Sequence, residues 1–335
     1  MNFAHGGDVE GFALEIGCDV SEVIDLSSNI NFIKPEINID FNTIDISSYP
    51  KYDTLYETIA KHYEVQNTEL EVINGASSAI FSLFRSFDTR YCYIYSPAYL
   101  EYKKAAVRFE YQIELVNRYV ELDKEVLENS LVVFVNPSTP DGSFYDMDAL
   151  LSKWMKKNCT IIIDESFIEF TAQKSSVEYL KKYDKLFILK SLTKFYSCAG
   201  VRIGTVLSTS QNIEKLKLHE PMWKLSQFDM RYIQEALKDT KFPKISKAVN
   251  ITNKQFLIKI LQECKYINHI FDSSANFVLV QLQNINATQF AELLKPHKIM
   301  IRDCSNFDFL DDEFVRIAVK STKNLERLKE ALRCI

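Results

Sequence analysis

Short, unbroken runs of apolar residues are the feature that most constrains how this chain can fold. Six runs have the length of strands and are separated by stretches with helical periodicity, at residues 91–96, 112–117, 131–136, 160–164, 186–190 and 203–208. A strand that is covered on both faces gives a continuous apolar run, whereas a strand with one wet face alternates apolar and polar residues. The runs therefore predict a mainly parallel sheet buried between two layers of helices.

The stretches between these runs complete an α/β sandwich, with helices expected at residues 77–87, 99–109, 147–157 and 213–219. After about residue 225 the pattern predicts a smaller α+β domain, with helices at 227–237, 245–263, 287–295 and from 323, and strands at 277–282 and 314–319. The first 45 residues are too irregular to form a domain alone. We therefore predict a large domain at residues 46–225 and a small domain formed by residues 1–45 and 226–335.

Composition and charge exclude several classes of partner. The chain has 335 residues, of which 47% are apolar and 25% charged, a balance that suits a globular protein with a sizeable core. Its formal net charge is -5 and no segment concentrates Lys and Arg, so neither nucleic acid nor an anionic membrane is an expected partner. No apolar segment reaches the ~18 residues that a membrane span needs. The seven cysteines form no CxxC pair, so we expect reduced thiols in the cytoplasm and no metal site.

Glycine is scarce and clustered, and its clusters help to single out four motifs. Six of the 8 glycines lie beside polar or charged residues, where backbone freedom or close approach is expected, at positions 6, 7, 75, 142, 200 and 204. In doubly wound sheets, ligands bind beyond the carboxyl ends of the strands. Four segments are expected there, namely "NGASSA" (74–79), "VNPSTPDG" (135–142), "IDESFIEF" (163–170) and "LFILKSLTKFYSCAGVRIG" (186–204). We expect them to converge on one cleft.

The last of these segments places Lys194 after a buried strand and near Arg202. One interpretation is an ordinary surface lysine. The other is a lysine whose pKa is lowered by the neighbouring cation and by partial burial, which makes it competent to bond an aldehyde near neutral pH. Ser191, Thr193 and Arg202 offer hydroxyls and a guanidinium to a phosphate, and "NGASSA" offers backbone N–H groups at a helix start. The implied ligand is an aldehyde that carries a phosphate.

Asp164 ends the run "TIIID", so its carboxylate is expected at the same cleft. Taken alone, it is as consistent with a helix N-cap or a solvated loop acid. Together with Lys194 and a phosphate site, it is a candidate partner for a pyridinium nitrogen, and such a charge-assisted bond keeps the ring protonated as an electron sink. These groups predict pyridoxal 5′-phosphate as the cofactor.

The segment "SLTKFYSCAGVRIG" resembles the signature of fold-type I pyridoxal phosphate enzymes in the aminotransferase class I/II superfamily. Within that group, "AHGGDVEGFALEIG", "DLSSNIN", "SANFVLV" and "MIRDCSNFDFLDDEFVRIAVKS" look most like the L-threonine-O-3-phosphate decarboxylases of cobalamin biosynthesis, and less like the related histidinol-phosphate aminotransferases. The resemblance covers essentially the whole chain. It implies an α/β protein with a large domain, whose mixed, mainly parallel sheet lies between helices, and a smaller α+β domain.

The resemblance also implies roles for individual residues. Lys194 would bond the cofactor aldehyde, Asp164 would pair with the ring nitrogen and Tyr99 would stack on the ring. The cofactor phosphate would be held by Ala76, Ser77, Ser191 and Arg202, and by Tyr49 of a neighbouring subunit, which implies a homodimer. The substrate's phosphate and carboxylate would be bound by His5, Asn29, Arg302 and Arg316.

Two positions depart from the pattern of aminotransferases. The family's "NPNNPTG" is "NPSTPDG" here, so Thr139 replaces the asparagine that hydrogen-bonds the cofactor's ring hydroxyl; a hydroxyl has one donor where an amide has two. Phe167 stands where aminotransferases usually have a tyrosine, and the resemblance to the decarboxylases leads us to expect phenylalanine there.

The expected reaction is decarboxylation of L-threonine O-3-phosphate or L-serine O-phosphate to CO₂ and an amino alcohol phosphate. These substrates differ by one methyl group, which is worth only ~1–3 kcal/mol of discrimination, so the sequence does not choose between them. The alternative is an aminotransferase of a phosphorylated amino alcohol such as histidinol phosphate. A third hypothesis is a scaffold that has lost catalysis, which the change at Thr139 alone favours.

Overall fold

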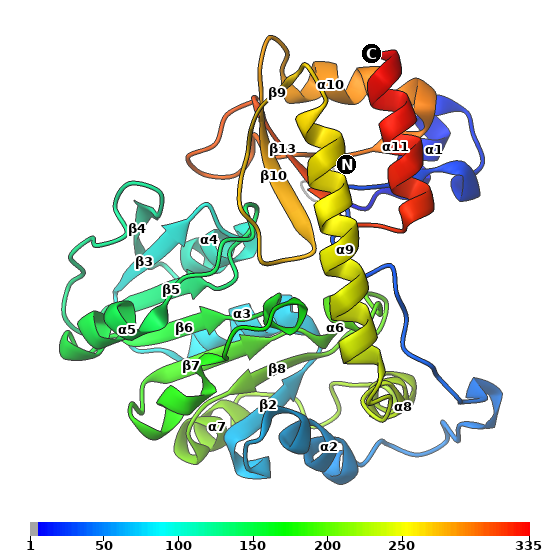
Figure 1. The fold of residues 1–335 in the computed structure, drawn as a ribbon. Helices are drawn as coiled ribbons and strands as arrows, with labels where there is room; N and C mark the ends of the chain where they lie inside the picture. Colours follow the sequence, from blue (N-terminus) through cyan, green and yellow to red (C-terminus); the bar gives the residue numbers. More distant parts are fainter. Residues whose placement is uncertain (1–5) are drawn as a thin grey trace.

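The computed structural model describes residues 6–335, and its largest sheet has seven strands (Figure 1). The strands lie in the order β2, β8, β7, β6, β5, β3, β4. β8 is antiparallel to both of its neighbours, and the other neighbouring strands are parallel. Their bounds are Leu70–Ile73 (β2), Tyr91–Ser96 (β3), Gln112–Asn117 (β4), Leu131–Val135 (β5), Thr160–Asp164 (β6), Leu186–Lys190 (β7) and Gly204–Leu207 (β8). The predicted mixed, mainly parallel sheet is thus confirmed.

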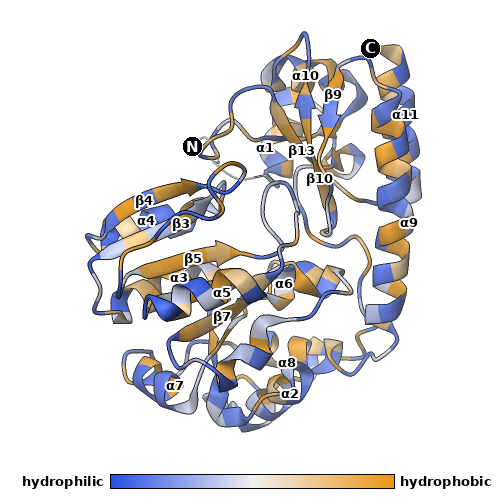
Figure 2. Cartoon of the chain, turned by 60° about the vertical axis from the view of Figure 1, so that its left-hand side comes forward, coloured by the Kyte–Doolittle hydropathy of each residue, from blue (hydrophilic) through white to orange (hydrophobic). Residues whose placement is uncertain are grey.

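Helices cover both faces of this sheet because its inner strands are apolar on both sides; Figure 2 shows β5 and β7 as hydrophobic ribbons among helices of mixed colour. One face packs against α3 (Gly75–Ser86), α4 (Leu100–Arg108) and α7 (Ser210–Lys217). The other face packs against α2 (Asp53–Tyr63), α5 (Met147–Lys156), α6 (Leu192–Phe195) and α8 (Gln227–Ala236). The sheet therefore has two apolar cores, one on each face.

A four-stranded antiparallel sheet forms a separate layer with its own core. Its order is β12 (Arg302–Asp303), β13 (Phe314–Ala318), β10 (Phe277–Leu282), β9 (Ile267–Ile270). It packs with α10 (Ala287–Leu294) and α11 (Thr322–Cys334). The N-terminal segment, which contains α1 (Val9–Ile16), joins this part of the chain because β1 (Ile24–Asp25) pairs in parallel with β11 (Ile299–Met300).

The helix α9 (Phe242–Gln262) connects the two parts, and in Figure 1 it runs alongside both sheets. Its first residue, Phe242, is buried in a core of the seven-stranded sheet, whereas Leu257 and Ile260 are buried in the core of the smaller sheet. The preceding helix α8 also packs on the larger sheet. The domain division predicted at residues 45 and 226 stays a prediction. Helix α9, which packs on both sheets, begins shortly after the second of these boundaries.

The apolar runs located the strands from β3 to β8 but gave no sign of β2 or α2. The sequence of β2, "LEVI", places a glutamate in a short strand. Glu71 is nevertheless buried, because it accepts a 2.8 Å hydrogen bond from the Tyr56 hydroxyl and forms an ion pair with Lys224. Among residues 6–335 there is no helix with the length and hydropathy needed to span a membrane.

Candidate active site

The carboxyl ends of β5, β6 and β7 open into a cavity of about 460 Å³ between the two sheets. The other walls include the start of α3, strands β12 and β13, and the N-terminal segment at Gly6, Gly7 and residues 27–30. Of the residues predicted from the sequence, the cavity brings together Asn29, Ala76, Ser77, Tyr99, Thr139, Asp164, Ser191, Lys194, Arg202, Arg302 and Arg316. His5 lies outside the described residues, and Tyr49 does not line the cavity.

Lys194 lies on the short helix α6, directly beyond the end of β7. Its backbone carbonyl accepts a 3.0 Å hydrogen bond from the backbone N–H of Asn31. Its Nζ lies 5.1 Å from the centre of the Phe167 ring. Burial lowers the pKa of Lys194; the charges of Arg316 and Arg202 act in the same direction, and Asp164 opposes them. A lysine with a lowered pKa has more free amine near neutral pH, which bonding to an aldehyde requires.

Asp164 is held in one orientation by three hydrogen bonds. Its Oδ1 accepts from the backbone N–H and the hydroxyl of Ser166, at 2.9 and 2.5 Å, and its Oδ2 accepts from the Tyr102 hydroxyl at 2.8 Å. Burial raises the pKa of Tyr102, with the Asp164 charge adding to the effect, so the phenol stays a neutral donor. Asp164 itself is 5% exposed, and it lines the cavity. The result is a fixed carboxylate that can accept a hydrogen bond from a protonated ring nitrogen.

The start of α3 supplies the opposite wall of the cavity with backbone N–H donors. Gly75 has a φ of +81°, and a Cβ there would lie 2.5 Å from Nη2 of Arg202, so glycine lets the guanidinium reach the helix start. Asn74 does not cap the helix with its side chain, which leaves the first amides for another acceptor. A Cβ on Gly204 would lie 2.6 Å from the Ala76 nitrogen, whereas a Cβ on Gly200 would meet open space. Of these last two glycines, only Gly204 is therefore required by close packing.

Hydroxyl groups lie next to this helix start. The Ser77 and Tyr99 hydroxyls are 3.1 Å apart, and those of Ser191 and Thr193 are 3.0 Å apart. With the guanidinium of Arg202 and the amides of α3, they form a donor-rich pocket of the kind that binds phosphate.

Arg316 lies on β13, which faces the ends of the strands of the larger sheet, and it is 7% exposed. Its Nη1 donates to the Thr139 hydroxyl oxygen and its Nη2 donates to the Ser27 carbonyl, both at 3.1 Å. Its buried Nε has no hydrogen-bond partner among the described residues. Burial lowers the pKa of Arg316 to about 10. A buried guanidinium with spare donors is suited to an anionic ligand.

Arg302 is the cross-strand partner of Arg316 in the pairing of β12 with β13. Its guanidinium donates to the Asp303 carbonyl at 2.5 Å and to Asn306 Oδ1 at 2.7 Å, and it lies 5.5 Å from the centre of the Phe307 ring. Asn29 lines the cavity beside these arginines, and its carbonyl accepts a 2.9 Å hydrogen bond from Asn276. Two cations from adjacent strands thus reach the same cavity as Lys194.

The residues present fit pyridoxal phosphate on the chemistry of their groups. The donor-rich pocket suits its phosphate, Asp164 suits its ring nitrogen and the Lys194 amine suits its aldehyde. The Tyr99 ring is the aromatic side chain that the sequence predicted against the cofactor ring, and it lines the cavity. The individual cofactor contacts remain predictions.

Tyr49 lies on another part of the surface. Its side chain is 69% exposed and stacks on Trp223, with ring centroids 4.1 Å apart and planes inclined by 21°. Its predicted contact with the cofactor phosphate of a neighbouring subunit remains a prediction.

Several side chains that shape the cavity were missed by the sequence analysis. Tyr102 and Ser166 orient Asp164, and Asn31 fixes the backbone of Lys194 while its side chain donates to the Phe195 carbonyl at 2.8 Å. Ser166 lies two residues after Asp164, a spacing at which a hydroxyl or amide commonly bonds back to a carboxylate, so this partner could have been found. Tyr102 and Asn31 act through contacts far apart in sequence, and nothing local identifies them.

Comparisons with known proteins agree on the family. A family model described as aminotransferase class I and II matches residues 22–335. A relative from Caldanaerobacter subterraneus subsp. tengcongensis, provisionally named threonine-phosphate decarboxylase, is 30% identical over 99% of this chain and 93% of its own length. The solved histidinol-phosphate aminotransferase of Clostridium acetobutylicum is 29% identical, with a TM-score of 0.82 over 93% of this chain and 98% of that chain.

The solved L-threonine-O-3-phosphate decarboxylase of Porphyromonas gingivalis is 22% identical and shares the fold, with a TM-score of 0.78 over 86% of this chain and 90% of that chain. Its likeness confirms the predicted architecture and says nothing further about substrate. The chain therefore belongs to the aminotransferase class I and II family, has the fold-type I architecture, and is an enzyme whose cofactor is pyridoxal 5′-phosphate.

Proposed function

We propose that this enzyme decarboxylates an O-phosphorylated amino acid, L-threonine O-3-phosphate or L-serine O-phosphate, to CO₂ and an amino alcohol phosphate. The observation that carries the proposal is the pair Arg302 and Arg316, which lie opposite each other on β12 and β13 and face the cavity that contains Lys194. Like charges on directly opposite residues are destabilising. A substrate with both a phosphate and a carboxylate would offset that repulsion.

The chain's own residues decide which bond at the substrate's Cα breaks, because they hold its two anionic groups. The bound cofactor supplies the electron sink that accepts the electron pair of that bond. Arg316 is held in place by Thr139 and Ser27, and its Nε has no hydrogen-bond partner among residues 6–335. It would orient one anionic group, and Arg302 would bind the other. Lys194 would then return a proton to Cα.

The contact between Lys194 and Phe167 supports decarboxylation over transamination. Nζ lies over the ring of Phe167, where aminotransferases usually have a tyrosine. A phenylalanine has no hydroxyl to donate beside the lysine and the cofactor. The provisionally named threonine-phosphate decarboxylase, at 30% identity over nearly the whole chain, supports the same choice.

An aminotransferase of a phosphorylated amino alcohol such as histidinol phosphate is the second candidate. The structural likeness to the Clostridium acetobutylicum histidinol-phosphate aminotransferase favours it. In that reaction Lys194 would carry the proton from Cα to the cofactor instead of returning one to Cα. A non-catalytic scaffold is disfavoured, because Lys194, Asp164 and Arg202 all line one cavity.

The decisive experiment incubates the holoenzyme with O-phosphothreonine and, separately, with O-phosphoserine in the absence of any keto acid. We expect release of CO₂ and formation of the matching amino alcohol phosphate. Failure to release CO₂, together with amino-group transfer from histidinol phosphate to 2-oxoglutarate, would replace this proposal by the second candidate. The Lys194→Ala variant is the blank for both assays.

The proposal includes a cytoplasmic homodimer in which Tyr49 reaches the cofactor phosphate of the other subunit. The exposed stack of Tyr49 and Trp223 supports it, because both rings present apolar area to the outside. Sedimentation of the holoenzyme is expected to give a dimer, and Tyr49→Phe is expected to weaken cofactor binding. A monomeric holoenzyme, or a Tyr49→Phe variant that binds the cofactor as tightly as wild type, would contradict this part. The seven cysteines are all free thiols, as a reducing compartment allows.

A further inference from the structure

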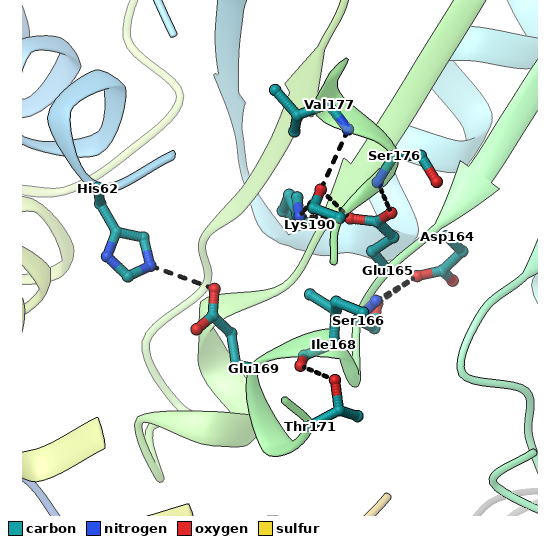
Figure 3. A network of polar contacts seen from close by, with 11 residues as sticks. His62, Asp164, Glu165, Ser166, Ile168, Glu169, Thr171, Ser176, Val177 and Lys190 are labelled. Atoms are coloured by element: carbon teal, nitrogen blue, oxygen red, sulfur yellow. Dashed lines mark hydrogen bonds and ion pairs between the residues drawn. The ribbon is translucent and has the colours of Figure 1, made fainter. Parts of the chain in front are cut away.

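A buried ion pair lies on the other side of the strand ends from the cofactor cavity. Glu165 follows the last residue of β6, and Lys190 is the last residue of β7. Their side chains are 1% and 3% exposed, and they form an ion pair (Figure 3). The proposed reaction assigns no role to either residue.

Strand alternation explains why this pair turns away from the cavity. Successive side chains of a strand point to opposite faces of a sheet. Asp164 and Ser191 share the parity of Ile162 and Leu189, which are buried beneath α3 and α4. Glu165 and Lys190 share the parity of the residues in the opposite core, and Lys190 lines a second cavity there. Asp164 is thus adjacent in sequence to Glu165, and Ser191 is adjacent in sequence to Lys190.

Both members of the pair are hydrogen-bonded to the segment that follows β6. The Glu165 carboxylate accepts from the Ser176 amide and the Ser175 hydroxyl, both at 2.6 Å, as well as from Lys190. Lys190 also donates to the Ser175 hydroxyl at 2.9 Å and lies 5.1 Å from the centre of the Tyr63 ring. The Glu165 amide donates to the Leu189 carbonyl at 2.8 Å, so backbone and side-chain bonds join the same two strand ends.

Stability alone is a weak reason for this arrangement. A buried ion pair commonly contributes little more than apolar residues of the same volume, because removing two charges from water offsets their attraction. The pair instead restricts geometry, because two charged groups joined by several short hydrogen bonds hold their strand ends in few relative positions.

We propose that the Glu165–Lys190 pair is a positioning device for the cofactor site, because it fixes the ends of β6 and β7 and thereby sets Asp164 and Ser191 toward the cavity. This inference rests on the cofactor contacts predicted for Asp164 and Ser191, on which the proposed function also depends. It does not depend on which substrate the enzyme takes.

The test measures cofactor binding and needs no substrate, so it is separate from the test of the reaction. Glu165→Gln, Lys190→Met and the double variant are compared with wild type for the cofactor dissociation constant, the visible circular dichroism per bound cofactor and the unfolding of the apoenzyme. His62→Gln is the matched control, because His62 contacts Glu169 at 3.3 Å in the same second cavity and does not touch the pair.

Each single variant leaves one buried charge unpaired and is expected to be less stable, whereas the double variant leaves none and should recover stability. Its cofactor affinity is expected to remain about tenfold weaker, at the low end of what outer-shell partners contribute in metal sites, with a reduced visible circular dichroism. His62→Gln is expected to match wild type in cofactor affinity and circular dichroism.

A double variant that recovers stability and also binds the cofactor with wild-type affinity and circular dichroism would show a purely structural pair and overturn the proposal. Should that variant not fold, Glu165→Asp keeps the charge and shortens the side chain by one methylene. Weaker cofactor binding in Glu165→Asp, with binding retained in Lys190→Arg, supports the positioning role. Unchanged binding in Glu165→Asp contradicts it.

Discussion

Thr139 Oγ1 accepts a 3.1 Å hydrogen bond from Arg316 Nη1, and this contact joins the loop after β5 to a strand of the smaller sheet. The sequence pattern assigned this position to the cofactor's ring hydroxyl. In the structure the hydroxyl oxygen of Thr139 is an acceptor for the arginine, and its single O–H is left to donate elsewhere. Thr139 therefore has a hydrogen-bonding role in the site although it replaces asparagine. This weakens the one argument for a non-catalytic scaffold.

We expect Thr139→Val to raise KM for the phosphorylated substrate more than it lowers kcat. The change leaves a buried Arg316 donor unpaired, at a cost of ~1–3 kcal/mol, and a KM increase of about tenfold corresponds to the lower half of that range. Steady-state kinetics measure both constants. Thr139→Ser keeps the acceptor and should stay close to wild type; equal losses in the serine and valine variants would contradict a role for the hydroxyl.

Lys194→Ala is expected to abolish covalent attachment of the cofactor and to lower the rate of CO₂ release by about 10²–10⁴-fold, because the same amine moves the proton at Cα. Mass spectrometry after borohydride reduction shows whether the cofactor is attached. Lys254→Arg is the matched control, since burial lowers the pKa of Lys254 to about 8 but its Nζ donates to the Ala275 carbonyl at 2.9 Å instead of lining the cavity. Cofactor trapped on Lys194→Ala in wild-type yield would be inconsistent with this assignment.

The lowered pKa of Lys194 sets the sign of a pH effect on the apoenzyme. Between its lowered folded pKa and the unfolded value of about 10.4, the unfolded chain binds more protons at this site than the folded chain. The free energy of unfolding contributed by this residue therefore rises with pH across that window. The free energy of unfolding of apo Lys194→Met, relative to that of apo wild type, is expected to fall as pH rises; urea unfolding of both at neutral and at alkaline pH measures it. A relative free energy of unfolding that rises with pH would contradict the assigned direction.

Tyr102→Phe is expected to weaken cofactor binding by about tenfold or more, because a hydrogen bond to a charged group contributes ~1.5–3 kcal/mol and the freed Asp164 oxygen loses its fixed direction. Titration of the apoenzyme with cofactor measures the effect. Tyr111→Phe is a matched control, since its buried hydroxyl donates to the Phe84 carbonyl at 2.7 Å, away from the site. If both variants bind equally well, Tyr102 does not act through Asp164.

The sequence located the parts of the fold and site that depend on local pattern. Strands such as "TIIID" and "LFILK" are buried on both faces, so their composition alone identified them, and Asp164 and Lys194 were found because they lie at or just beyond such strands. β9 was not predicted because it is only partly buried, and β2 was not predicted because Glu71 interrupts its apolar pattern.

What local pattern could not supply is the set of partners that meet only after folding. Asn31 lies far from Lys194 in sequence, yet its backbone N–H donates a hydrogen bond to the Lys194 carbonyl. Tyr102 lies on a helix on one face of the sheet, and its hydroxyl donates to Asp164. Nothing in the local pattern pairs Lys190 with Glu165, and the register of β6 and β7 places them together.

The position of β8 has a consequence for how the enzyme matures during synthesis. β2 leads into the helix start expected to receive the cofactor phosphate. Among residues 6–335 its one partner strand is β8, and Gly204 of β8 packs against that same helix start. A ribosome that adds ~5–20 residues per second exposes β2 long before β8 emerges. The nascent chain therefore has no complete phosphate-binding pocket until β8 has left the ribosome, and capture of the cofactor is expected only after that point in synthesis.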